Sequence, residues 1–303
     1  MYSTDANLPS SFWLASASAT ASVRSSVSAV AMLDRGTNRG GCRLCRQRPE
    51  TVIGSGSEVP FGLEGVLGIV YVAIGQRERY VEWCRAQLAR GRDTHTLTRT
   101  WLVLALSHAG AGEEARAAKG LIEAAEATHN PWALAYALRA YGYAFRDADP
   151  VRALEALRRG LVIAQDSGNR LVESQLATAL SQLEAEHDDP LAALDDITLA
   201  IRHFDDSGNV GLIRSPLATL AVFLDRLGRL EPAATIAGFA FDPHTASVVP
   251  QLTTAITHLR DVLDDQTYES LARKGEAMTT AAMVSYAYDE IDQARTELNT
   301  VSK

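Results

Sequence analysis

Cysteine is scarce in this sequence, with three among 303 residues. A small, odd number does not make a disulfide framework, so a reducing, cytoplasmic environment is predicted. Cys42 and Cys45 have the spacing of half a zinc site, but structural zinc needs four ligands, and no second C-x-x-C or pair of histidines lies nearby. The seven histidines are scattered and form no H-E-x-x-H motif. We therefore expect no metal and no cofactor.

Motifs of catalysis are missing as well. No G-x-x-x-x-G-K-[ST] occurs, and the glycine-rich GSGSE at residues 54–58 has no lysine after it, so no phosphate cradle is predicted. No G-x-S-x-G elbow occurs, and Ser167 and Ser207, each beside a glycine, have no repeat-linked histidine to act as base. The sequence therefore predicts a protein that is not an enzyme and has no catalytic residues.

Long apolar runs and basic stripes are also lacking. The most apolar run, residues 61–74, is too short to cross a bilayer and contains Glu64, so a buried helix is predicted there. The N-terminus lacks the basic start, apolar block and cleavage site of a secretory signal. The net charge is −8, and no stripe of Lys and Arg follows residue 60. Neither a membrane nor a nucleic acid is therefore predicted as a partner.

Composition changes along the chain and predicts three regions. Residues 1–57 are rich in Ser, Ala and Gly without a helical or strand period, which predicts disorder. Residues 58–240 have apolar residues at helical spacing and are predicted to be helical repeats. Residues 241–303 predict a C-terminal cap of two helices, 251–274 and 280–298, which are separated by Gly275, with Thr279 or Thr280 capping the second.

The tetrapeptide DSGN occurs twice, at residues 166–169 and 206–209, and indicates a repeat of 40 residues. A catalytic turn would not need two copies in register, so these residues are predicted to be helix junctions. Glycine suits a left-handed helix end, asparagine can cap the next helix, and an Asp-Pro pair supplies an N-cap followed by proline at the first helical position. The predicted junction residues are Asp149, Pro150, Gly168, Asn169, Asp189, Pro190, Gly208 and Asn209.

Between these junctions the apolar positions repeat too. One helix has Leu154, Leu157, Leu161 and Ala164, and the next has Leu194, Ile197, Ile201 and Phe204, each 40 residues further on. Steps of three and four residues place each set on one helical stripe. His129, His187 and His203 are predicted in last helical turns, near free carbonyls. No segment alternates like a strand, so the sequence predicts an all-α fold, an α-solenoid of antiparallel helix hairpins.

The hairpin YGYAFRDADPVRALEALRRGL resembles the tetratricopeptide (TPR) pattern, with Gly142 at a tight helix contact and Ala153 at a small one. The tail, IAGFAFDPHTASVVPQL with LRDVLDDQTYESLARKGEAMTTAAMVSYAYDEIDQA, resembles the C-terminal region of actinobacterial STAND-type ATPase signalling proteins, which include LuxR-family regulators and adenylate or guanylate cyclases. The resemblance covers residues 60–303 and implies a helical sensor arm. The ATPase, cyclase and helix-turn-helix motifs of that family are missing, so the resemblance does not imply their activities.

Aromatic residues supply the candidate binding site. Trp132, Tyr136, Arg139 and Tyr143 follow at steps of four, three and four residues, which places them near one stripe of a first helix, the kind that lines the concave face of TPR-like solenoids. Core packing is the competing interpretation, since an aromatic stripe at this spacing is more often interior. The candidate partner groove consists of Trp132, Tyr136, Arg139, Tyr143, Arg170, Glu173 and Gln175.

The predicted function is a non-enzymatic scaffold or sensor module that binds a protein or peptide partner in signalling or transcriptional regulation. The alternative is that the chain is a C-terminal fragment of a LuxR-type or cyclase-type STAND ATPase whose catalytic and DNA-binding parts are encoded elsewhere.

Overall fold

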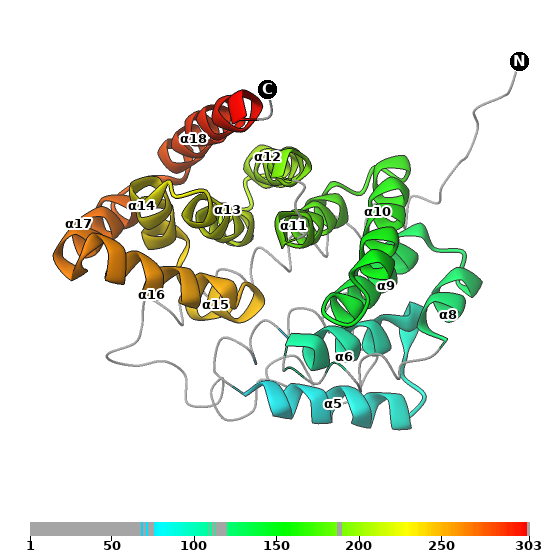
Figure 1. The fold of residues 1–303 in the computed structure, drawn as a ribbon. Helices are drawn as coiled ribbons and strands as arrows, with labels where there is room; N and C mark the ends of the chain where they lie inside the picture. Colours follow the sequence, from blue (N-terminus) through cyan, green and yellow to red (C-terminus); the bar gives the residue numbers. More distant parts are fainter. Residues whose placement is uncertain are drawn as a thin grey trace, which may run out of the picture. The chain divides into compact units, whose positions relative to one another are not determined.

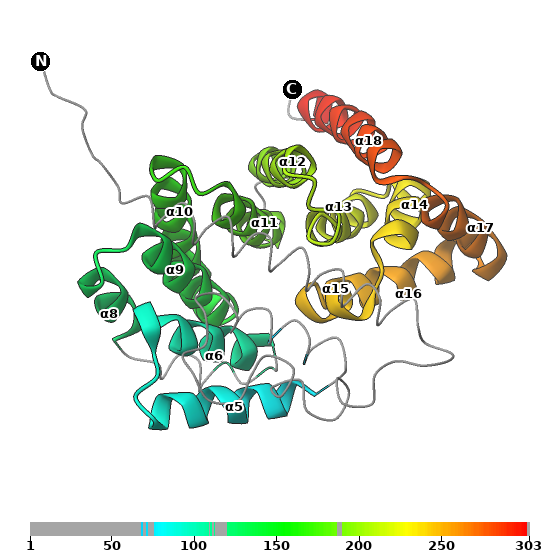
Figure 2. The ribbon, with the colours of Figure 1, turned by 180° about the vertical axis from the view of Figure 1, so that it is seen from behind.

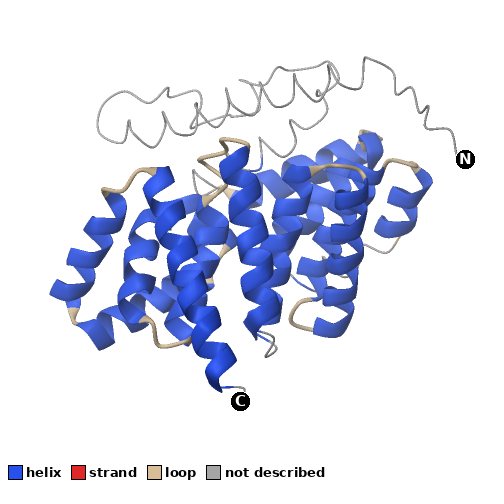
Figure 3. Cartoon of the chain, turned by 90° about the horizontal axis from the view of Figure 1, so that it is seen from above, coloured by secondary structure: helices blue, strands red, loops and turns tan. Residues whose placement is uncertain are grey.

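A computed structural model of the protein describes residues 76–108, 120–186 and 190–301, together with Gly68, Tyr71, Gly110 and Gly112. The chain divides into two compact units, Met1–Thr94 and His95–Lys303. The described residues are helices joined by turns and include no strand, so the predicted all-α class is confirmed for them (Figure 3). The predictions for residues 1–57, with Cys42 and Cys45, and for His187 and Asp189 fall outside the described residues.

The first unit contributes one described helix, α5 (Arg77–Ala89). Its buried face includes Tyr80 and Cys84, and the Tyr80 ring lies 5.9 Å from that of Tyr71. Gly68 and Tyr71 are the described members of the apolar run 61–74, and both are helical and buried. None of the described helices is long and apolar enough to cross a bilayer.

The second unit holds the remaining helices, and a short 3-10 turn, η1 (Thr94–Thr96), leads into them. Consecutive helices from α9 to α14 pack against one another, and α11 also contacts α9 and α13 (Figures 1 and 2). The helices are α6 (Leu97–His108), α8 (Leu121–Ala127), α9 (Pro131–Phe145), α10 (Pro150–Asp166), α11 (Arg170–Glu186), α12 (Pro190–Asp206), α13 (Arg214–Arg226), α14 (Leu230–Ala240), α15 (Pro243–Val248), α16 (Gln251–Leu263), α17 (Asp265–Glu276) and α18 (Thr280–Val301).

Junction chemistry sets where these helices begin and end. Gly168 and Gly208 follow α10 and α12 with φ of +67° and +64°, a left-handed conformation that other residues adopt only with strain. The Asn169 side chain accepts a hydrogen bond from the Val172 N–H (3.2 Å) and caps α11. Asp149 accepts from the Arg152 N–H (3.1 Å) and caps α10, with Pro150 at the first helical position.

The C-terminal region departs from its predicted form in several places. The single helix predicted over residues 251–274 is wrong, because the chain breaks between α16 and α17 at Asp264, whose φ is +67°. The Asp264 carboxylate accepts hydrogen bonds from the Thr267 N–H and Oγ1 (both 3.0 Å), so it caps α17 as a new helix. The short helix α15 was not predicted either. Thr279 caps α18 by accepting from the Ala282 N–H (3.2 Å).

Gly275 does not separate two helices, as the sequence predicted, but lies inside the last turn of α17. Its role is close approach: a Cβ at Gly275 would lie 1.9 Å from the Thr235 carbonyl oxygen of α14, and one at Gly238 would lie 2.2 Å from the Ala272 carbonyl oxygen. The backbones of α14 and α17 therefore touch where both helices have a glycine.

The main core lies among α12, α13, α14 and the C-terminal helices. Leu194, Ile197, Ile201 and Phe204 form the buried face of α12 and belong to this core. The α10 copy of this stripe is less enclosed, because Leu157 and Ala164 are buried while Leu154 and Leu161 are half-buried.

Two arginines bind α18 to the earlier helices. Arg229, just before α14, donates hydrogen bonds to the side chains of Glu290, Gln293 and Glu297 of α18 at 2.5–2.7 Å. Arg295 of α18 donates to Asp195 (2.6 Å) and Thr198 (3.1 Å) of α12. We call these two arginines with their partners the C-terminal seam.

Candidate functional site

The aromatic stripe of α9 is positioned by the start of that helix. The Asn130 side chain accepts from the Trp132 N–H (3.0 Å), and Pro131 occupies the first helical position. The Trp132 and Tyr136 rings are 4.7 Å apart, and the Arg139 guanidinium lies 5.3 Å from the centre of the Tyr143 ring. Both tyrosines are buried, whereas Trp132 and Arg139 are partly exposed. Part of the stripe is thus core, and part of it reaches the surface.

Gln175 joins the stripe from α11. It hydrogen-bonds the Tyr136 side chain. Burial raises the pKa of Tyr136, while the nearby positive charge of Arg139 and this hydrogen bond act in the opposite direction. Gln175, Gln182 and Glu186 follow at steps of seven and four residues, so α11 presents one polar stripe on the side of α9.

Arg170 and Glu173 are not brought to this stripe. Arg170 is exposed at the first residue of α11. Glu173 is buried, and its carboxylate oxygen lies 3.3 Å from Nδ1 of His203 on α12. His203 lies in the last turn of α12, as predicted, but the neighbour of its Nδ1 is this carboxylate and not a free carbonyl of the helix end. Glu173 and Gln175 are two positions apart in the sequence, so their side chains point to different sides of α11.

His244 of α15 reaches the same region, although the sequence gave no sign of it. Asp242 caps α15 by accepting from the Thr245 N–H (2.7 Å), which sets the start of this short helix. Burial lowers the pKa of His244; Asp242 acts against that shift, and the charge of Arg139 adds to it. Its imidazole is therefore neutral near pH 7. We call Trp132, Tyr136, Arg139, Tyr143, Gln175 and His244 the Arg139 cluster.

The Arg139 cluster has unfilled hydrogen-bonding capacity. Nε and Nη1 of Arg139, Oε1 of Gln175 and Nδ1 of His244 are buried and have no hydrogen-bond partner among the described residues. Oε1 of Gln182, further along the polar stripe of α11, is also buried without a hydrogen-bond partner. Buried polar groups are normally paired, because an unpaired one costs about 1–3 kcal/mol and a charged one more.

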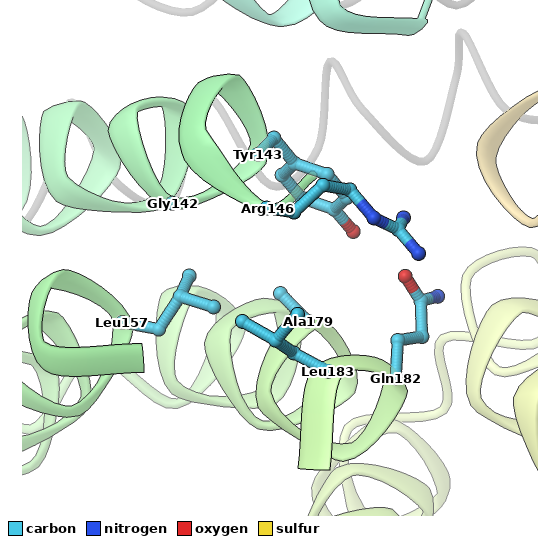
Figure 4. A pocket seen from close by; sticks show the side chains of 7 residues that line it. All are labelled: Gly142, Tyr143, Arg146, Leu157, Ala179, Gln182 and Leu183. Carbon is cyan, nitrogen blue, oxygen red and sulfur yellow. The ribbon is translucent and has the colours of Figure 1, made fainter. Parts of the chain in front are cut away.

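A small hollow borders the cluster, lined by Gly142, Tyr143, Arg146, Leu157, Ala179, Gln182 and Leu183. In Figure 4 the polar ends of Tyr143, Arg146 and Gln182 point toward one another, and Leu157, Ala179 and Leu183 line the other part. The free volume is about 10 Å³, close to the minimum for one water molecule. A Cβ on Gly142 would lie 2.5 Å from Leu157, so α9 and α10 approach closely here. This hollow can hold a water but no metabolite.

A second polar group lies on another side of α11. Nη2 of Arg158 donates to Glu184 (2.9 Å), a buried residue, and Glu184 interacts with Asp196 of α12. Burial raises the pKa of Asp196 to about 8, and the negative charge of Glu184 adds to this shift. This acid pair ties α10, α11 and α12 together. Within the part of the chain that the structure describes, no three His, Cys, Asp or Glu side chains gather as metal ligands.

The roles of these residues rest on the geometry above. No protein-family model matches the chain, and no curated protein has a significantly similar sequence.

Proposed function

We propose that residues 95–301 form a TPR-like α-solenoid, closed by the helices after residue 240, which binds a segment of a protein or peptide partner without catalysing a reaction. The observation that carries this proposal is the Arg139 cluster, where aromatic rings, a guanidinium and unpaired polar atoms meet at a partly exposed surface.

The solenoid is supported by the sequence period and by helix contacts. The junctions recur every 40 residues, and the first helices α9, α11 and α13 lie beside one another through α11. Stacked two-helix units of this kind bury their apolar faces against their neighbours and present the first helices on one surface. The helices α15 to α18 cover the last pair, α13 and α14, as a terminal cap does.

A partner segment suits the Arg139 cluster better than a small molecule. A peptide carries an N–H and a C=O at nearly every residue, which can pair with partly exposed polar side chains such as Gln175 and Arg139. Rings such as Trp132 supply apolar contact area, and Trp, Tyr and Arg are enriched where protein interfaces gain most of their binding energy. The neighbouring hollow holds no more than a water molecule.

A cytoplasmic place in signalling or transcriptional regulation is supported by the resemblance of the chain to the sensor arms of STAND-type regulators. Helical repeats are generic frames whose specificity depends on a few surface side chains, so the frame alone does not identify the partner.

The proposal is tested by quantitative affinity capture from the native cell with three forms of the full chain. The forms are the wild type, Trp132→Ala in the Arg139 cluster, and Val162→Ser as control, because Val162 is 54% exposed on α10. Circular dichroism checks that each form is folded. A protein counts as a partner if the wild type and the control capture it and Trp132→Ala captures at least about tenfold less of it. A loss of about tenfold is what removal of a strong interface residue typically causes. If no captured protein depends on Trp132, the proposal fails.

A further inference from the structure

Arg139 and Arg146 lie on the same helix, seven residues apart, in different electrostatic surroundings. The Arg146 guanidinium is 3.0 Å from the carboxylate of Glu186, which lies 40 residues further along the chain. The residue 40 positions after Arg139 is Ala179, a buried residue of α11 that lines the hollow. The repeat therefore places an acid opposite Arg146 and an alanine at the equivalent position for Arg139.

Among the described residues, no other acid pairs with Arg139. The described residues that interact with Arg139 are Tyr143, Tyr136 and His244, of which none is anionic at neutral pH. Asp242, the acid closest in sequence to His244, lies 3.9 Å from Arg214. A guanidinium with two buried nitrogens and no counter-ion carries an uncompensated desolvation cost, which an anion from outside would offset.

We infer that Arg139 binds the carboxylate of an acidic side chain, Asp or Glu, in the partner segment. This inference rests on the proposed function, since it names the chemistry of the ligand at the same surface. Arginine suits this task because its planar fork matches a carboxylate and always carries its charge.

A side chain fits better than a chain end, because binding capacity continues on both sides of Arg139. Toward the start of α9, Tyr136 pairs with Gln175, whose Oε1 is free. Toward its end, Tyr143 and Gln182 line the same hollow, and Oε1 of Gln182 is free. A segment that lies along this stripe of α9 passes Arg139 in its middle and presents a side-chain carboxylate there.

The test uses a displayed library of random twelve-residue peptides, selected on the full-length wild type and on the matched variants Arg139→Gln and Arg146→Gln. We expect the wild type and Arg146→Gln to enrich peptides with Asp or Glu at one internal position, and Arg139→Gln to lose that preference. In a selected peptide, exchange of that Glu for Gln should weaken binding to the wild type about tenfold to a hundredfold, the range of a charge-assisted hydrogen bond. The same exchange should change binding to Arg139→Gln less than about twofold.

A second variant, Ala179→Glu, gives Arg139 an internal carboxylate like that of Arg146. Because Ala179 is buried in the hollow, circular dichroism first checks that this variant is folded, and the folded variant should no longer prefer acidic peptides. The inference is overturned if Arg139→Gln keeps the acid preference, if Ala179→Glu binds acidic peptides as the wild type does, or if the essential carboxylate is a free C-terminus. Peptides that need Trp132 but show no acid preference overturn the inference and leave the proposed function standing. If no peptide binding depends on Trp132 or Arg139, both fall.

Discussion

The Arg139 cluster and the C-terminal seam both contain an arginine that is largely buried, yet their partners differ. The side chain of Arg229 is 12% exposed, and it binds the carboxylates of Glu290 and Glu297. Arg139 has no carboxylate among the described residues, and two of its nitrogens are buried without a partner. Arg229 thus joins helices through carboxylates of the same chain, whereas Arg139 has hydrogen-bonding atoms that no described residue pairs. Removal of the Arg229 side chain should therefore cost much more stability than removal of the Arg139 side chain.

The largest expected effect lies beside the seam, where α14 and α17 touch. Gly275→Val should lower the free energy of unfolding by about 3 kcal/mol or more, because the new side chain would collide with the Thr235 carbonyl oxygen and only separation of the helices relieves a backbone contact. Urea unfolding measures the change. Ser270→Val, at an exposed site of the same helix, is the control and should cost at most about 0.5 kcal/mol. Equal losses of unfolding free energy in the two variants would show that the close approach of α14 and α17 does not cause the destabilisation.

Arg229→Met should cost about 3 kcal/mol. The change leaves Glu290, which is 7% exposed, as a carboxylate without its partner. Arg260→Met is the matched control, since Arg260 binds Asp265 and Glu269 at the surface and such pairs contribute at most about 1 kcal/mol. Thermal unfolding of both variants at low and high salt compares them. If Arg229→Met costs no more than its control, the seam does not hold α18 in place.

Much of the helical pattern was predictable because its signals are local. A left-handed glycine, an asparagine cap and an Asp-Pro start depend on a few neighbouring residues, and two copies in register distinguish such junctions from a catalytic turn. The break at Asp264 escaped prediction because the apolar stripe continues on both sides of it. Gly275 was misassigned because a glycine near a helix end suits both a C-cap and a close helix contact, and only the position of α14 decides between them.

The candidate site was predictable only in part. The α9 stripe and Gln175 follow from helical spacing, which is local information. Glu173 faces α12, where its carboxylate lies beside His203. The spacing of residues within α11 does not indicate this contact between helices. His244 comes from a different helix more than 100 residues after Arg139, and the free state of the Arg139 nitrogens depends on which side chains are absent nearby. The sequence therefore indicates which face to consider but not which of its charges are unpaired.

The acid pair between α11 and α12 should give the protein a pH dependence of stability. Folding raises the pKa of Asp196 to about 8, so the folded state keeps this proton at pH values where the unfolded state has lost it. The folded state then binds more protons between about pH 4 and pH 8, and stability falls as pH rises through that range. Asp196→Asn should remove this slope, so its stability relative to the wild type should rise steadily from about pH 5 to about pH 8.

Thermal unfolding from pH 5 to pH 8 measures the slope. Asp195→Asn is the neighbouring control, because Asp195 is 75% exposed and paired with Arg295. Its charge raises the pKa of Asp196 less than burial and Glu184 do, so this variant should keep most of the slope. Parallel curves for wild type and Asp196→Asn would show that Asp196 is ionised in the folded protein at pH 7.

The smallest effect on stability, and the sharpest contrast, is expected for Arg139→Met. The change removes a buried charge that has no carboxylate and loses one stacking contact with Tyr143, worth about 0.5–1 kcal/mol. The two terms have opposite signs, so the free energy of unfolding should stay within about 1 kcal/mol of the wild type or rise. The same substitution at Arg229 should cost about 3 kcal/mol, since it leaves acids unpaired.

A loss of about 2 kcal/mol or more with Arg139→Met, seen in urea unfolding, would make Arg139 a structural residue and favour core packing as the role of the α9 stripe. Unchanged stability together with lost partner binding would mean that the cost of burying Arg139 alone is offset only when the partner supplies the missing carboxylate.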